Sequence, residues 1–323
     1  LAWQENIPVV SVIHNIYAWL ASDILNSFRA HDPYVTKYVA VSHDAGKFLG
    51  TRFHVDEHRI EIIPNGLNLS EVSGASMHRS ELGLQDEDFV FLCVGSIYRV
   101  KGQDRIIRAM PELLARHPQV KLVLLGQHMD VAYHDYLKKL ISRHGLDDHV
   151  IFASYTDDVG PYYKIANAFV LPSIIEGWSL AMMEAMYHEL PIVMTDISGA
   201  SSIVKEHHLG ILVSPPFDSL YQLDPSLFQK YTMIPDDPVL PELVQAMENM
   251  CREHETWLAR AKKGKELIQD CFHIQKTAQQ HIDLLWECHD DALRAQCENL
   301  KQKVAHTHKT VDDLWSTVER LSD

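Results

Sequence analysis

The chain has 323 residues, of which 46% are hydrophobic and 23% charged, and its formal net charge at pH 7 is −15. This length and composition predict a globular protein of about two domains. The negative charge argues against a non-specific nucleic-acid binder, because such a protein needs clustered Lys and Arg to displace the counterions of phosphates. The five cysteines are odd in number and form no CxxC pair, which favours a reducing compartment such as the cytoplasm over a disulfide framework or a zinc site.

Short apolar runs alternate with stretches of helical periodicity from the start to about residue 215, a pattern typical of βαβ units and a parallel sheet. A turn and linker are expected at 64–84, an irregular Pro-rich loop at 215–241, and helices after it. The expected strands are 9–13, 38–41, 60–63, 89–94, 121–125, 150–152, 168–171 and 191–195, and the clearest helices are 105–116, 133–144 and 180–187.

The last part of the chain carries a heptad pattern. Residues 291–323 place four leucines on one heptad position, and one cysteine and three valines on another, which favours a short parallel coiled coil and a homodimer. The alternative is a pair of amphipathic helices that fold back on the body. The positions concerned are Leu293, Leu300, Leu314 and Leu321, then Cys297, Val304, Val311 and Val318.

The segment 171–185, which follows a buried strand and opens a helix, carries the strongest candidate site. In an open parallel sheet, ligands bind outside the carboxyl ends of the strands. Gly177 would let the backbone approach a ligand closely, and the free N–H groups of the new helix around Ser179 and Leu180 would suit an anion such as a phosphate.

Glu176 and Glu184 are about 12 Å apart if both lie on a helix, which exceeds the roughly 5–9.5 Å between the carboxylates of a glycosidase. They could instead hold two ends of an elongated ligand, each accepting hydrogen bonds from hydroxyls, as a sugar nucleotide would require. The alternative is a solvated helix charge at Glu184 and a first-turn residue favoured by the helix dipole at Glu176.

A second cluster follows the strand 89–94 and contains Gly95, Ser96, Arg99, Lys101 and Gly102. Fixed positive charge beside a helix N-terminus suits a diphosphate, although a solvated basic loop is the alternative. The spacing matches neither a P-loop nor the GxGxxG of a dinucleotide fold.

His14 ends an apolar strand, where a structural histidine is the alternative to a functional one. The histidines form no HxxxH or other strong metal spacing, so no metal site is expected.

Taken in order, these motifs resemble the family 4 (group 1) retaining glycosyltransferases over residues 38 to about 214, and Glu176 to Glu184 resembles the E-x7-E signature of that family. The resemblance implies the GT-B fold, an α/β architecture of two Rossmann-like domains. The other segments that carry it are Pro64-Asn65-Gly66, the loop from Gly95 to Gly102, Val123 to Gly126, Tyr162-Tyr163-Lys164 and Ile197-Ser198-Gly199.

The resemblance implies transfer of a hexose, with retention, from a UDP- or GDP-sugar to a glycan or lipid-linked acceptor in polysaccharide biosynthesis. Glu184 would hold the ribose, Glu176 the transferred sugar and Lys101 the leaving diphosphate, while His14 would face the sugar across the cleft. No cofactor or metal is implied, and the enzyme would act in the cytoplasm, with peripheral association at the inner face of the membrane. The implied donor-binding residues are Gly95, Ser96, Arg99, Lys101, Gly126, Glu176, Gly177, Trp178, Ser179, Leu180 and Glu184.

The resemblance also implies an order of units. Residues 1–77 would be the end of the acceptor-side domain with the linker, 78–265 the donor domain, 266–290 a helix packing back, and 291–323 the coiled coil. A long segment that the family has before His14 is expected to be missing here. A non-catalytic sugar-nucleotide-binding scaffold and a GT-B-fold nucleotide-sugar epimerase remain as alternatives.

Two positions depart from the family pattern. Ser96 stands where the family usually has Arg, so either Arg99 substitutes for that charge or the affinity for a diphosphate is lower. Asn68 replaces the usual linker Asp.

Overall fold

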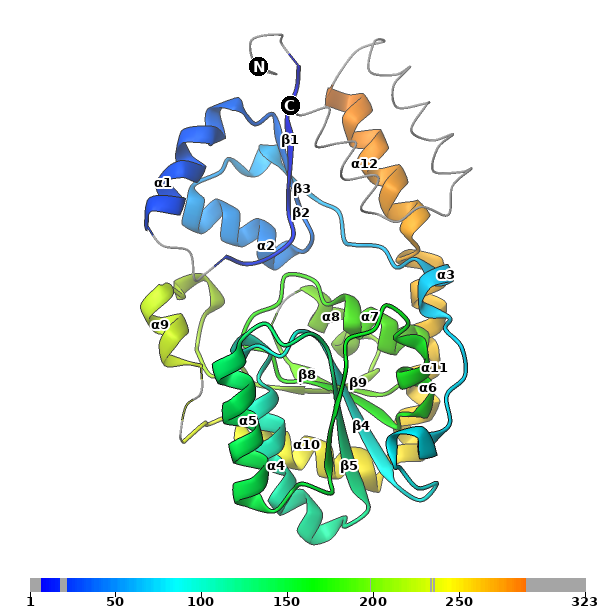
Figure 1. The fold of residues 1–323 in the computed structure, drawn as a ribbon. Helices are drawn as coiled ribbons and strands as arrows, with labels where there is room; N and C mark the ends of the chain where they lie inside the picture. The colour runs from blue at the N-terminus through cyan, green and yellow to red at the C-terminus, as the bar shows by residue number, and fades with distance from the viewer. Residues whose placement is uncertain (1–6, 18–21, 198, 233, 235, 289–323) are drawn as a thin grey trace.

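The computed structural model describes residues 7–17, 22–197, 199–232, 234 and 236–288. They form an α/β protein with two parallel sheets, one above the other in the view of Figure 1, which confirms the predicted fold class. The strand order is β1-β2-β3 in the first sheet and β6-β5-β4-β7-β8-β9 in the second. The predicted coiled coil at 291–323 lies outside the described residues.

The first sheet is small and carries short helices. Its strands are β1 (Val10–Ile13), β2 (Lys37–Ala40) and β3 (Ile60–Ile62), and α1 (Ser22–His31) and α2 (His43–Phe48) connect them. β2 pairs with both neighbours in parallel, and its residues from Tyr38 to Ala40 are buried.

The second sheet has six strands that alternate with helices. Because both of its faces are covered, β4 and β7 are buried along their whole length and appear in the sequence as continuous apolar runs. The strands are β4 (Phe89–Val94), β5 (Val120–Leu125), β6 (Val150–Ala153), β7 (Ala168–Leu171), β8 (Ile192–Thr195) and β9 (Gly210–Val213), and the helices between them are α4 (Gln103–Arg116), α5 (Val131–His144), α6 (Gly160–Ile165), α7 (Leu180–Tyr187) and α8 (Gly199–Glu206).

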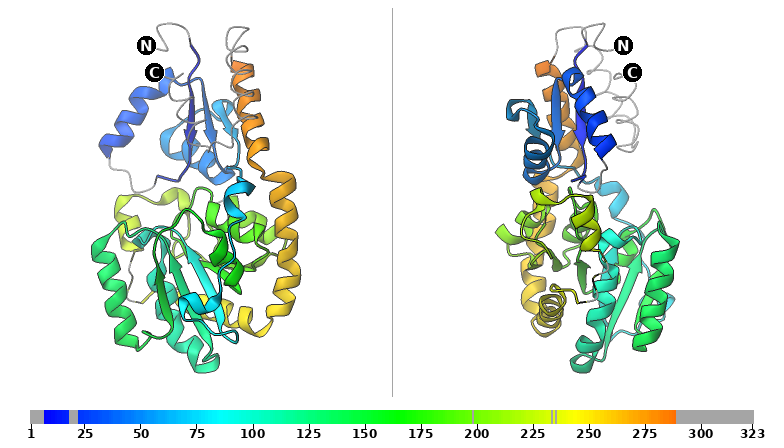
Figure 2. Two further views of the ribbon diagram at one scale, coloured as in Figure 1. Left: turned by 45° about the vertical axis from the view of Figure 1, so that its right-hand side comes forward. Right: turned by 90° about the vertical axis from the view of Figure 1, so that its left-hand side faces the viewer.

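The chain crosses between the sheets twice on one side of the molecule. A linker with α3 (Leu69–Val72) leads from the first sheet to the second, and α10 (Leu240–Arg252) and α11 (His254–Cys271) pack on the second sheet before α12 (Ile274–Cys288) returns to the first (Figure 2). The backbone of Leu67 bonds to both Phe272 and Ile274, so the two crossings meet. The expected helical segment 266–290 is therefore divided, because α11 ends at Cys271 and α12 begins at Ile274.

The prediction of an irregular loop at 215–241 is wrong in part, because the segment contains short helices and buried side chains. It contains α9 (Pro225–Lys230), which lies between the two sheets in Figure 1. Phe217 and Leu223 join a buried cluster that contains residues of the first sheet and also Ile174 and Ile175 from the second. We call residues 215–239 the bridge segment.

None of the helices described is long and apolar enough to cross a membrane.

Candidate functional site

The order of the second sheet defines where a ligand can enter. From β4 the chain proceeds outward through β5 and β6, then returns to β7 beside β4 and proceeds outward on the other side. The connections that follow β4 and β7 therefore lead towards opposite edges of the sheet, and in a sheet of this order a ligand is expected outside the carboxyl ends of these two strands. These loops are residues 95–102 and 172–179, the two segments in which the sequence predicted ligand groups.

The structure brings Lys101 and Glu176 together. Lys101 Nζ donates to Glu176 Oε1 at 2.6 Å, and the hydroxyl of Ser173 donates to the same oxygen at 2.8 Å. The two loops are also joined through their backbones, since Ile174 N–H donates to the carbonyl of Val100 at 2.8 Å. Glu176 is only 6% exposed. A cation and a carboxylate are thus held together by two hydrogen-bonded loops at the carboxyl ends of β4 and β7. We call this place, where the strand order reverses, the switch point.

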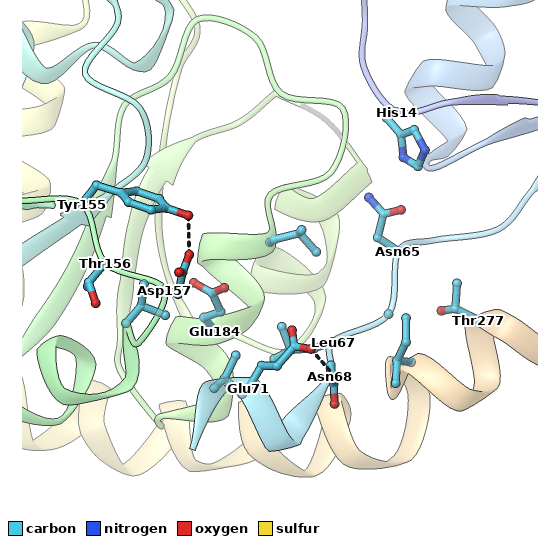
Figure 3. Close-up of a pocket in the computed structure, with 15 residues that line it drawn as sticks. His14, Asn65, Leu67, Asn68, Glu71, Tyr155, Thr156, Asp157, Glu184 and Thr277 are labelled. Atoms are coloured by element: carbon cyan, nitrogen blue, oxygen red, sulfur yellow. Dashed lines mark hydrogen bonds between the residues drawn. The ribbon is translucent and has the colours of Figure 1, made fainter. Parts of the chain in front are cut away.

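A cavity of about 540 Å³ lies between the linker, the loop after β6, α7 and the start of α12. Of the predicted site residues it is lined by His14, Leu180 and Glu184, whereas Lys101 and Glu176 are not among its lining residues. Glu184 lies in its middle, with His14 and Asn65 at one end and Tyr155 and Asp157 at the other (Figure 3). It has the size of a small-molecule site and is lined by both sheets' connections.

Glu184 is half-buried beside a neutral partner. The hydroxyl of Tyr163, on α6, donates to Glu184 Oε2 at 2.7 Å. Burial raises the pKa of Glu184 to about 7, and the hydrogen bond from Tyr163 opposes this shift. Near neutral pH this carboxyl therefore exists in both protonation states, and its ionised form can accept hydrogen bonds from ligand hydroxyls.

His14 follows β1 and lies at the end of the cavity opposite Tyr155. Burial lowers the pKa of His14, and a hydrogen bond with Asn65 acts in the opposite direction. A neutral imidazole at this position can accept as well as donate a hydrogen bond.

Gly177 meets the first sheet rather than an open space. A Cβ built on Gly177 would overlap the carbonyl oxygen of His14 and lie 2.7 Å from the Cα of Asn15. The chain after β1 thus occupies the space on the Cβ side of Gly177. The approach of the Gly177 backbone to a ligand stays a prediction. Gly126 has a similar packing role, since a Cβ there would overlap the carbonyl of Gly95.

The structure places other predicted residues in supporting roles. Trp178 is buried, and its indole N–H points to Met183 Sδ at 2.7 Å, so only its backbone is left for a ligand. The side chain of Ser179 caps α7 by accepting from Met182 N–H at 3.2 Å, and Leu180 is exposed and lines the cavity.

In the loop 95–102, the guanidinium of Arg99 bonds to Asp130 at 2.6 Å. The positive charge that Arg99 was expected to supply, in place of the Arg that the family has at Ser96, is therefore paired with a carboxylate. The carbonyl of Ser96 accepts from the side chain of Gln103 at 2.9 Å.

No motif in the sequence pointed to the loop after β6 as part of the site. Tyr155, Thr156 and Asp157 all line the cavity, and the phenol of Tyr155 donates to Asp157 at 2.5 Å. Their only signal was their place after a predicted strand, because they form no recognisable motif. Within the described part of the chain, no three His, Cys, Asp or Glu side chains gather in a way that could hold a metal ion.

This strand order and these loops define a doubly wound α/β protein, a class whose members bind ligands outside the carboxyl ends of such strands. Residues 76–221 match the model of the glycosyl transferases group 1, and residues 1–71 match that of glycosyltransferase family 4. The chain belongs to the family 4 (group 1) glycosyltransferases.

Two glycosyltransferases from other organisms are similar to this chain in sequence. The chain is 30% identical over 226 residues to an uncharacterised glycosyltransferase of Methanocaldococcus jannaschii, covering 64% of this chain and 56% of that protein. It is 25% identical over 243 residues to the Escherichia coli UDP-Gal:alpha-D-GlcNAc-diphosphoundecaprenol alpha-1,3-galactosyltransferase, covering 73% of this chain and 60% of that protein. The chain thus spans little more than half the length of these relatives.

Solved structures show the same fold. The Anabaena protein HepE, crystallised with UDP-glucose, has a TM-score of 0.74 at 18% identity, with 88% of this chain and 73% of that chain covered. The sucrose-phosphate synthase of Thermosynechococcus elongatus has a TM-score of 0.70 at 23% identity, with 88% and 69% covered. These likenesses confirm the predicted GT-B fold.

Proposed function

We propose that this chain supplies the donor site of a retaining hexosyltransferase that takes its sugar from a UDP- or GDP-sugar. The observation that carries the proposal is the pairing of Lys101 with Glu176 at the carboxyl ends of β4 and β7, together with a cavity that His14, Leu180 and Glu184 line. The acceptor would be a glycan or a lipid-linked sugar in polysaccharide synthesis. The whole enzyme would act in the cytoplasm, at the inner face of the membrane where its acceptor is lipid-linked.

The charges at the switch point suit the departure of a diphosphate. Breaking the bond between sugar and phosphate builds negative charge on the diphosphate and positive charge on the sugar ring. Lys101 and the free N–H groups at the start of α7 would stabilise the first, while Glu176 would stabilise the second. The donor would have to displace Lys101 from Glu176, which would leave both groups beside the bond that breaks.

The cavity suits the nucleoside half of the donor. Glu184 would accept hydrogen bonds from the ribose hydroxyls, and the exposed ring of Tyr155 offers a face on which a base can stack. His14 would face the transferred sugar from the side of the first sheet. Retention would follow from attack on the face from which the diphosphate leaves, a reaction that requires no metal ion in this proposal.

Two named relatives support this choice of donor. The Escherichia coli relative is named for transfer from UDP-Gal, and HepE was crystallised with UDP-glucose.

Calorimetry with UDP-, GDP- and ADP-sugars tests the donor site. We expect one nucleotide class to bind and Glu184→Gln to weaken that binding by about 10- to 100-fold, the loss of a charged hydrogen bond to a ligand hydroxyl. Glu112→Gln is the control, because Glu112 is exposed on α4. A chain that binds none of these ligands, or an unchanged affinity in Glu184→Gln, would contradict the assignment. Donor binding without turnover in the whole protein would support the scaffold alternative.

A further inference from the structure

Arg105 is a buried cation below both loops of the site. It lies in the first turn of α4, and its side chain is 2% exposed. Its Nε donates to Asp237 Oδ2 at 2.5 Å, one terminal nitrogen donates to the carbonyl of Pro172 at 3.2 Å, and the other donates to the carbonyl of Tyr231 at 3.3 Å. A buried guanidinium is tolerated only with such partners, so this geometry is strongly specified.

Asp237 is held in place independently of Arg105. Its other carboxylate oxygen accepts from Val239 N–H at 3.0 Å, and its carbonyl accepts from Leu240 N–H at 3.1 Å, both at the start of α10. The Asp237 side chain is 1% exposed. The carboxylate is thus a fixed point on the body of the second sheet, 132 residues from Arg105 along the chain.

The Pro172 carbonyl connects Arg105 to the candidate site. Pro172 follows β7, and the next residue, Ser173, donates its hydroxyl to Glu176 at 2.8 Å. The backbones of the two loops lie close together here, because a Cβ built on Gly102 would overlap the Pro172 carbonyl oxygen. Gly102 also has a φ of 70°, a backbone angle that residues with a Cβ rarely adopt.

We propose that Arg105 is a positioning residue for the transferred sugar, and this rests on the function proposed above. Asp237 fixes the guanidinium, the guanidinium fixes the Pro172 carbonyl, and that carbonyl sets the place of Ser173 and Glu176. The bridge segment also contributes, through the Tyr231 carbonyl, to where the sugar-binding carboxylate stands.

The planar fork of Arg105 is what this role requires. It donates in three directions at once, whereas a lysine would keep the charge but, as a single ammonium on a flexible stem, could not hold both Asp237 and the Pro172 carbonyl in this geometry. Arg105→Lys therefore separates the positioning role from simple charge neutralisation.

Calorimetry of Arg105→Lys with UDP-glucose and with UDP tests the proposal. We expect the affinity for UDP-glucose to fall at least about tenfold more than the affinity for UDP, because small displacements of a positioned group have large effects. Asp237→Asn should act in the same direction and is the variant to use if Arg105→Lys does not fold. Arg116→Lys, an exposed position on the same helix with its own partners Glu112 and Glu248, should change neither affinity. Equal losses for both ligands, or no loss, would overturn the proposal.

Hydrogen exchange provides a readout without ligand. We expect faster amide exchange in residues 172–178 of Arg105→Lys and unchanged exchange in α11, compared with Arg116→Lys. If the wild-type chain bound neither UDP nor UDP-glucose, the proposed function would fail with these ligands, and exchange would still decide whether Arg105 anchors this loop. Unchanged exchange at 172–178 would show that it does not.

Discussion

Glu176 and Glu184, eight positions apart in the chain, have different partners. Glu176 has a cation 2.6 Å away and a hydroxyl that donates to the same oxygen. Glu184 is half-buried, with the neutral phenol of Tyr163 as its partner. The spacing of the two residues was visible in the sequence, whereas their partners were not, because Lys101 and Tyr163 come from other loops and helices. Their different surroundings suit different ends of one ligand.

The raised pKa of Glu184 predicts a change of stability with pH. Below about pH 4.5 the folded and unfolded states both hold the proton. As pH rises towards 7 the unfolded state loses it while the folded state keeps it, so the free energy of unfolding falls, by about 3 kcal/mol in all for a shift from 4.5 to about 7. Above about pH 7 both states are ionised and the loss stays constant.

Glu184→Gln should remove this contribution. Urea unfolding at pH 5 and pH 8 should show the variant gaining stability relative to the wild type as pH rises, and other titrating groups cancel in that difference. Glu112→Gln, at an exposed site, should show a flat difference. An equally flat difference for Glu184→Gln would contradict the raised pKa.

At the scale of elements, the sequence predicted what is locally periodic or uniformly apolar. The strands 89–94 and 168–171 were predicted with the bounds that the structure has, because they are buried on both faces. Strand β9 was missed, since it has four residues and begins at a glycine. Helices α2 and α6 have six residues each, too few to show a helical period.

The bridge segment could not be predicted for a different reason. Its fold depends on partners far along the chain, such as Arg105 for Asp237 and Asp44 for Tyr221. The loop after β6 entered the site in the same way, because strand order rather than local sequence placed it there.

The contact between Gly177 and the chain after β1 can be tested by adding one methyl group. Gly177→Ala would place a Cβ against the backbone of His14 and Asn15, so one of the two segments must move. We expect a loss of about 1–3 kcal/mol in the free energy of unfolding, typical of overpacking, together with weaker donor binding. Gly50→Ala is the control, because the nearest atom to its Cβ is 3.8 Å away. Equal stabilities of the two variants would refute the close approach.

At the scale of the molecule, the two sheets share a core. Ile16 of the first sheet's connections packs in one buried cluster with Ile174 and Ile175, which directly precede Glu176, and with Phe217 of the bridge segment. The site is therefore shaped by the seam between the two sheets as well as by the second sheet. Cooperative unfolding of both sheets is the expected consequence of such shared burial.

A hydrogen bond between Tyr221 and Asp44 joins the bridge segment to α2 beside the first sheet. Its strength can be used to test how firmly the bridge segment holds the two sheets together. The Tyr221 hydroxyl donates to Asp44 at 2.6 Å, and Lys47 lies 4.5 Å from the centre of the ring. A double-mutant cycle of Tyr221→Phe and Asp44→Ala, followed by urea unfolding, should give a coupling energy of about 1–2 kcal/mol, as for a hydrogen bond to a charged group. The matched control is Tyr155→Phe with Asp157→Ala, the same chemistry within one exposed loop, which should show no measurable coupling. Two separate unfolding transitions, or a Tyr221–Asp44 coupling no larger than that of the control, would mean that the bridge segment lies against the first sheet without stabilising its contact with the second.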